Sequence, residues 1–130
     1  MSLAAIQTKA KAKPSIVIIY GPSGLGKTTL AVGSKNPIVL QTEEGLGILT
    51  NNREIPHFPL AKDYDTFYGY LKSLVDADEL DYSTLVVDSL DWLEPLIFAK
   101  TCEAHKQASI ESFGYGRGYV EALKYWREIL

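Results

Sequence analysis

Cysteine, long apolar runs and excess positive charge are all scarce in this sequence. Cys102 is the single cysteine, so no disulfide can form within the chain, and we expect a reducing, cytoplasmic compartment. No apolar run approaches the roughly 18 residues of a membrane-spanning helix. The 16 acidic residues outnumber the 13 basic ones, and the net charge of −3 argues against a nucleic-acid binder that is basic over its whole surface. This net charge does not exclude a local basic site, and three lysines precede Pro14: Lys9, Lys11 and Lys13. We favour a solvated N-terminal arm for them, and the alternative is an arm that contacts DNA.

The order of apolar runs and turn residues predicts strands that alternate with helices. The 130 residues suit one domain, and we expect a flexible arm at 1–13 followed by a domain at 14–130. Because such alternation favours a parallel sheet, the expected fold class is α/β. The expected strands are 15–20, 38–41, 55–60 and 84–87, and the expected helices are 27–34, 66–77, a helix from about 93, and 119–130.

Some of these elements carry a more specific expectation. The β-branched run Ser15–Tyr20 is typical of a strand buried on both faces of a parallel sheet. Asp63 or Asp65 can cap the helix that follows them, and Pro95 is expected in the first turn of its helix, where a missing N–H costs little. The apolar residues expected to be buried in the last two helices include Trp92, Tyr119, Leu123, Trp126 and Leu130.

A glycine-rich segment between the first strand and the first helix predicts a phosphate-binding loop. It fits the Walker A pattern G-x-x-x-x-G-K-[ST] at every fixed position. Its glycines let backbone N–H groups turn toward phosphate oxygens, Lys27 can reach the β- and γ-phosphates, and the Thr28 hydroxyl can ligate Mg²⁺. The expected nucleotide-binding residues are Gly21, Pro22, Ser23, Gly24, Leu25, Gly26, Lys27, Thr28 and Thr29.

Acidic residues follow two of the expected strands, at the sheet edge where parallel α/β folds bind their ligands. Asp88 comes directly after the strand 84–87, and we assign it to Mg²⁺ through water; the alternative is an Asp that only caps the next helix. Hydrolysis also needs a base, or a group that positions water. Glu43 is the expected base and is preferred over Glu44, although both could be solvated loop residues.

In this order, the features resemble the RecA-type recombinase ATPases, and more narrowly the phage and prophage ATP-binding proteins linked to single-strand annealing and recombination. The resemblance extends from about Ile16 to Leu130, with its most specific parts at 19–29, 42–43, 86–89 and 112–119. It implies a RecA-like three-layer P-loop fold, ATP and Mg²⁺ as ligands, self-association of the full-length protein, and the cytoplasm of a bacterial host if a phage encodes the chain. The roles it implies are phosphate and Mg²⁺ binding for Lys27 and Thr28, the Walker B acid for Asp88, and the catalytic glutamate for Glu43.

The glycine-rich segment 112–118 lies where RecA-type proteins place their first DNA-contacting loop. Phe113 and Tyr115 could stack on unpaired bases, and Arg117 could pair with phosphate. Two alternatives stay open: a subunit contact that sends Arg117 to a neighbour's nucleotide, and a plain flexible loop.

The resemblance also implies strands that this sequence does not contain. In RecA-type proteins a strand with a polar sensor residue follows the last helix and lies between the P-loop strand and the Walker B strand. We therefore expect a chain that is truncated at its C-terminus, with an incomplete sheet, exposed strand edges that favour association, and weak ATP hydrolysis.

Three functions are compatible with these residues. The first is a Mg²⁺-dependent ATPase that acts on single-stranded DNA in phage-type recombination or annealing, and we favour it. The second is a nucleotide-gated binding module with little turnover. The third is a small-molecule P-loop kinase, which the small number of arginines (Arg53, Arg117 and Arg127) argues against, because a kinase lid usually supplies several. A GTPase is disfavoured because no N-K-x-D motif is present.

Overall fold

The computed structural model describes residues 3–10, 12–46 and 54–130 of the chain, so Lys11 and Arg53 lie outside the described residues. The strands are β1 (Pro37–Gln41) and β2 (Thr84–Asp88). The α-helices are α1 (Lys27–Val32), α3 (Tyr64–Val75), α4 (Leu90–His105) and α5 (Arg117–Ile129), and two short 3-10 turns are η1 (Leu3–Ala5) and η2 (Glu111–Phe113). None of the helices in the described ranges is both long and apolar enough to cross a membrane.

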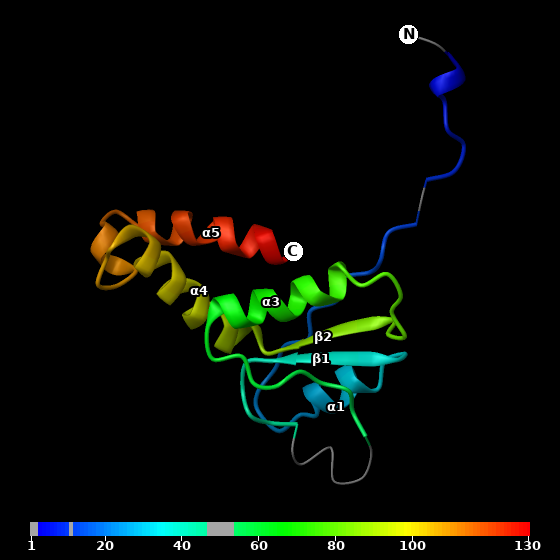
Figure 1. The fold of residues 1–130 in the computed structure, drawn as a ribbon, viewed down its shortest axis with the longest axis horizontal. Helices are drawn as coiled ribbons and strands as arrows, with labels where there is room; N and C mark the ends of the chain where they lie inside the picture. The colour runs from blue at the N-terminus through cyan, green and yellow to red at the C-terminus, as the bar shows by residue number, and fades with distance from the viewer. Residues whose placement is uncertain (1–2, 11, 47–53) are drawn as a thin grey trace.

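The two strands form a parallel sheet, as the alternation of strands and helices in the sequence predicts (Figure 1). They pair over their whole length, from Pro37 opposite Thr84 to Gln41 opposite Asp88, so their carboxyl ends meet at one edge. The expected strand 55–60 is reduced to a single bridge in which His57 pairs with Val39. Its two prolines have no N–H to donate to a longer ladder.

Consecutive residues of β1 supply two separate hydrophobic cores. Val39 packs on the α1 side with Val32 and Val86, whereas Leu40 packs on the other side with residues of α3, α4 and α5. Val39 and Leu40 are both fully buried, which is the outcome expected for a strand whose side chains alternate between two covered faces. The sheet therefore has a helix layer on each side, with α1 below it and α3 above it in Figure 1. The fold therefore has the predicted α/β class, with helices on both faces of a small parallel sheet.

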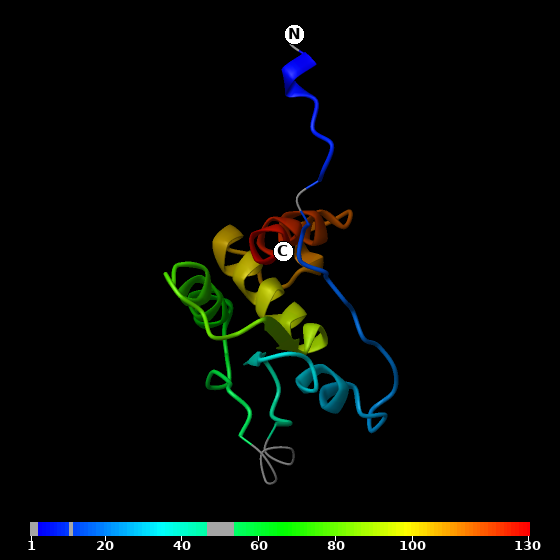
Figure 2. The ribbon, with the colours of Figure 1, turned by 90° about the vertical axis from the view of Figure 1, so that its right-hand side faces the viewer.

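The strand expected at 15–20 does not form. The segment is extended, but it pairs with neither β1 nor β2, and the side chains of Ile16, Val17 and Ile18 are 77%, 76% and 69% exposed. Figure 2 shows it as an extended stretch that passes outside the helices on its way to α1. A β-strand needs a neighbour to accept and donate its backbone hydrogen bonds, and the described residues provide none beside this segment.

Helix α4 begins earlier than the sequence indicates. Its first turn starts directly after Ser89, whose carbonyl oxygen accepts a hydrogen bond from the Leu93 N–H at 3.1 Å. Pro95 is therefore inside the helix and not in its first turn, so that prediction was wrong. The helix continues through Pro95 because Leu93 and Ile97 on either side of it are completely buried, and this burial outweighs the loss of one backbone bond.

Helix α5 buries a different face from the one predicted. Its buried residues are Gly118, Ala122 and Tyr125. Of the residues predicted to be buried, Trp126 is half-buried, and the others are exposed: Tyr119 (43%), Leu123 (42%) and Leu130 (81%). The cause is Gly118, because a Cβ atom there would overlap the carbonyl oxygen of Ile110. The small residues let α5 approach so closely that its bulky side chains turn outward. Trp92 is also 57% exposed, contrary to the expected core position.

Helix α3 matches its prediction closely. It spans Tyr64–Val75 where 66–77 was expected, and Asp63 caps it by accepting a hydrogen bond from the Thr66 N–H at 2.7 Å. Lys100 Nζ of α4 lies 2.8 Å from Asp65 Oδ1 and links the two helices at their exposed side.

Candidate functional site

The Walker A segment adopts a backbone conformation that requires its glycines. Gly24 and Gly26 have φ angles of 83° and 89°, in the left-handed region that other residues rarely adopt. A Cβ atom at either position would meet no other atom within 4 Å, so conformation and not crowding explains both glycines. Residues 21–26 and Thr29 are exposed, while Lys27 and Thr28 at the start of α1 are half-buried.

Lys27 lies back across the loop that precedes it. Its ammonium group donates hydrogen bonds to the carbonyl oxygens of Gly21 and Pro22 at 2.7 and 2.8 Å. A charged donor is thus held over the loop by two neutral acceptors. A phosphate oxygen would be a stronger acceptor for this ammonium group than a carbonyl oxygen, because both partners would then be charged.

Thr28 and Asp88 are brought together although 60 residues separate them in the chain. The Thr28 hydroxyl donates to Asp88 Oδ2 at 2.8 Å, and both residues are half-buried. Thr28 is held by the first turn of α1, and Asp88 is the last residue of β2. The sheet edge therefore presents a hydroxyl and a carboxylate side by side, next to the Walker A loop.

The end of β1 is tied to the end of β2 by Thr42, which is 7% exposed. The Thr42 N–H donates to the Asp88 carbonyl oxygen at 2.8 Å and extends the ladder by one bond. The Thr42 hydroxyl donates to the Ser89 carbonyl oxygen at 2.6 Å and accepts from the Ser89 N–H at 2.9 Å. The sequence predicted no role for Thr42, which entered only with Glu43 in the resemblance at 42–43. A hydroxyl directly after a buried strand was the signal available in the sequence.

The two candidate bases lie at the same edge. Glu43 follows Thr42 directly and is half-buried, whereas Glu44 is exposed. Since Gln41 pairs with Asp88 in the sheet register, Glu43 leaves β1 two residues beyond the level of Asp88. This difference in burial favours Glu43 over Glu44 as the group that would be held near a bound substrate.

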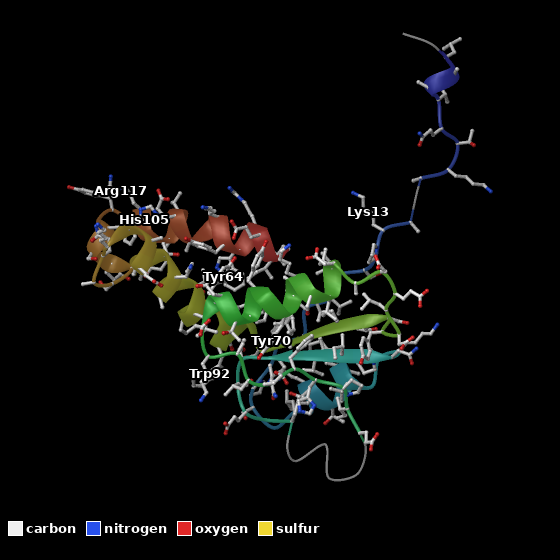
Figure 3. All side chains as sticks on the ribbon, in the orientation of Figure 1. Lys13, Tyr64, Tyr70, Trp92, His105 and Arg117 are labelled. Carbon is white, nitrogen blue, oxygen red and sulfur yellow. The ribbon has the colours of Figure 1, made fainter. Side chains whose placement is uncertain are left out.

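The segment 112–118 forms the turn between α4 and α5, at the end of the helical hairpin that lies away from α1 (Figures 1 and 3). Phe113 is half-buried and packs edge-to-face on His105, with ring centroids 5.3 Å apart. Arg117 is the first residue of α5, and its Nη2 donates to the Phe113 carbonyl oxygen at 3.2 Å. Tyr115 is fully exposed, with a left-handed φ of 51°. The fold thus separates this turn from the Walker A loop of the same chain.

The fold and the site together define a class. A glycine-dependent phosphate loop, a lysine held over it, and a loop threonine against the carboxylate of a neighbouring parallel strand form a P-loop nucleotide-binding site. A family model described as "AAA domain" matches residues 13–130, and the chain belongs to this AAA domain family.

The chain is also similar to a protein of prophage origin. The chain is similar to the SPbeta prophage-derived uncharacterized protein YorG of Bacillus subtilis (strain 168), with 27% identity over 116 residues. That match covers 88% of this chain and 36% of the relative, so the chain spans little more than a third of the relative's length. No solved structure matches the chain.

Proposed function

We propose that this chain is the nucleotide-binding part of a Mg²⁺-dependent ATPase. The observation that carries the proposal is the 2.8 Å hydrogen bond from the Thr28 hydroxyl to Asp88 Oδ2, which joins the Walker A loop to the tip of β2. Hydroxyl and carboxylate oxygens are the protein ligands that Mg²⁺ prefers, so these two residues fit a metal bound with the nucleotide. When bound, the metal would neutralise charge on the β- and γ-phosphates.

Lys27 and Glu43 supply the other two parts of this proposal. Lys27 exchanges its bonds to the Gly21 and Pro22 carbonyl oxygens for bonds to phosphate oxygens, which its position over the loop allows. Glu43 orients the attacking water and accepts its proton, from a half-buried position at the same edge of the sheet as Asp88.

We further propose that single-stranded DNA is the partner that this ATPase acts on, in phage-type recombination or annealing. Two observations support it: Tyr115 is fully exposed in the α4–α5 turn, two residues before Arg117, and the relative carries a prophage-derived name. An exposed aromatic ring and a guanidinium group in one turn are suited to stacking on bases and pairing with phosphate. Phe113 would contribute only if it left its contact with His105.

A subunit contact is the second candidate role for the same turn. Arg117 lies far from the Walker A loop of its own chain, at the other end of the α4–α5 hairpin (Figure 3). In a homo-oligomer of the full-length protein it would reach a nucleotide only on a neighbouring copy, where a guanidinium group could stabilise transferring phosphate.

ATP hydrolysis by the full-length protein, measured with and without single-stranded DNA, tests both proposals. We expect Lys27→Ala to lower the rate by about 100-fold or more, because it removes a donor aimed at developing charge. Lys35→Ala is the matched control, since Lys35 is an exposed lysine beyond the end of α1. Tyr115→Ala should abolish stimulation by DNA and leave the basal rate unchanged, and Tyr82→Ala, which alters a tyrosine outside the hairpin, should do neither.

The outcomes separate the candidate functions. A rate that DNA does not change would overturn the DNA partner and favour the subunit contact. Binding of Mg·ATP without turnover would overturn the ATPase and leave a nucleotide-gated binding module. A Lys27→Ala chain that hydrolyses ATP at the wild-type rate would overturn the nucleotide site itself.

A further inference from the structure

Three hydrogen bonds hold the backbone of Asp88 and Ser89, and Thr42 takes part in all of them. The Thr42 N–H binds the carbonyl oxygen of Asp88, and the Thr42 hydroxyl binds both the N–H and the carbonyl oxygen of Ser89. Their lengths lie between 2.6 and 2.9 Å. Because the ladder of β1 and β2 ends at Gln41 and Asp88, the hydroxyl continues the pairing past the point where the sheet stops.

The direction in which the Asp88 carboxylate points depends on the backbone on both sides of it. On its N-terminal side that backbone is fixed by the sheet, and on its C-terminal side it is fixed by Thr42 and by the Leu93 N–H, which also donates to the Ser89 carbonyl oxygen. The side chain of Ser89 makes no capping bond to α4, so the backbone of Ser89 is what the surrounding structure holds. Without the Thr42 hydroxyl, the Ser89 N–H would lose its partner at a half-buried position.

We propose that Thr42 is a positioning residue of the nucleotide site, whose hydroxyl holds the Asp88–Ser89 backbone so that the Asp88 carboxylate stays against Thr28. This inference rests on the proposed function, because it gives Thr42 a task only if Thr28 and Asp88 hold a metal with the nucleotide. Thr42 also precedes Glu43, so the same residue fixes the start of the segment that carries the expected base. The metal-holding carboxylate and the water-orienting carboxylate are then placed by one side chain.

Affinity for a fluorescent ATP analogue, measured on the full chain in Mg²⁺ and in EDTA, tests this role. We expect Thr42→Val to retain the affinity measured in EDTA, because the hydrogen bonds that Thr42 makes to described residues go to Asp88 and Ser89 and not to the Walker A loop. We expect the increase in affinity that Mg²⁺ gives to be about tenfold smaller in this variant than in the wild type, which is the usual effect of removing a group that orients a metal ligand. Thr42→Ser, which retains the hydroxyl, should restore most of that gain.

Thr101→Val is the matched control. Thr101 is fully buried in α4, and its hydroxyl donates to the Ile97 carbonyl oxygen at 2.8 Å, so the same substitution removes a buried hydroxyl far from the sheet edge. Its response to Mg²⁺ should equal that of the wild type even if its thermal stability falls. Circular dichroism establishes that each variant is folded, and Thr42→Ala replaces Thr42→Val in the measurement if the valine variant does not fold.

Several results would overturn the inference. The first is that Mg²⁺ increases the affinity of Thr42→Val as much as that of the wild type. The second is that Thr42→Val loses the same factor of affinity in Mg²⁺ and in EDTA. The third is that Thr42→Ser also loses the increase in affinity that Mg²⁺ gives. A wild-type chain that shows no gain from Mg²⁺ would overturn the proposed metal site, and this failure is visible before any variant is compared.

Discussion

At the scale of single residues, Asp63 is a carboxylate that both begins a helix and responds to pH. Its Oδ1 accepts the Thr66 N–H at 2.7 Å, and this hydrogen bond holds the pKa of Asp63 below its ordinary value of 3.8. A pKa that is lower in the folded chain means that folding favours the ionised form. The contribution of Asp63 to stability is therefore complete above about pH 4 and is lost as the pH falls through the folded-state pKa.

Asp63→Ala should therefore lower the midpoint of thermal unfolding at pH 7, and the difference from the wild type should shrink as the pH is lowered below 3.8. Thermal unfolding followed by circular dichroism between pH 7 and pH 2.5 measures this. Asp78→Ala, at an exposed position after α3, serves as the control. A difference between Asp63→Ala and the wild type that stayed constant down to pH 2.5 would contradict the assignment.

At the scale of elements, the contact between η2 and α5 depends on the absence of a side chain. Gly118→Ala would place a methyl group into the carbonyl oxygen of Ile110 and against Phe113, so the backbone itself would have to shift. We expect a loss of about 1–3 kcal/mol in the free energy of unfolding, measured by urea denaturation.

Gly69→Ala provides the contrast for this prediction. Gly69 lies within α3 and is exposed, and a Cβ atom there would meet nothing within 4 Å. Alanine is the better helix former by about 1 kcal/mol, so this variant should be more stable than the wild type. Equal effects of the two substitutions would show that helix propensity, and not the approach of α5 to Ile110, determines the result at Gly118.

The sequence predicted elements where local pattern and packing agree. The strands at 38–41 and 84–87 were predicted because each is a short apolar, β-branched run, and the structure pairs them with each other. The cap at Asp63 was predicted because a cap is a local feature. The strand at 15–20 failed because pairing needs a neighbour that local sequence cannot supply. The buried face of α5 was mistaken because bulky residues were expected inside, whereas Gly118 and Ala122 make the close contact.

The same distinction applies to the candidate site. The Walker A loop is contiguous in the chain, so its motif could be read directly, and its strand neighbour Asp88 could be named from the run before it. The bond between Thr28 and Asp88 is a long-range contact that the motif only suggests. The position of Thr42 directly after a buried strand was visible in the sequence, but its partners were not, because its hydroxyl bonds to backbone atoms of Ser89 and leaves no pattern in the side chains of Asp88 and Ser89.

At the scale of the whole molecule, the exposed apolar segment 15–20 should govern association. Ile16, Val17 and Ile18 are mostly exposed and extended, and an unpaired β-branched run of this kind favours strand-to-strand contacts between chains. We expect the full chain to self-associate with rising concentration in sedimentation experiments. The double variant Val17→Lys, Ile18→Lys should stay monomeric at concentrations where the wild type does not.

Leu3→Lys is the control for this prediction, because Leu3 is 84% exposed in η1 and apolar but lies outside the segment. It should associate like the wild type. If it reduced association as much as the double variant, general surface hydrophobicity and not the 15–20 segment would be the cause.

Helix α4 starts two residues after Asp88 and ends at His105, beside the turn that carries Tyr115. At 1.5 Å per residue its 16 residues measure about 24 Å, so its two ends lie about that far apart. A tilt of about 10° at Ser89 would carry the far end of a helix of this length through about 4 Å. Under the proposed function, a tilt of α4 on nucleotide binding would therefore move Tyr115 relative to the sheet.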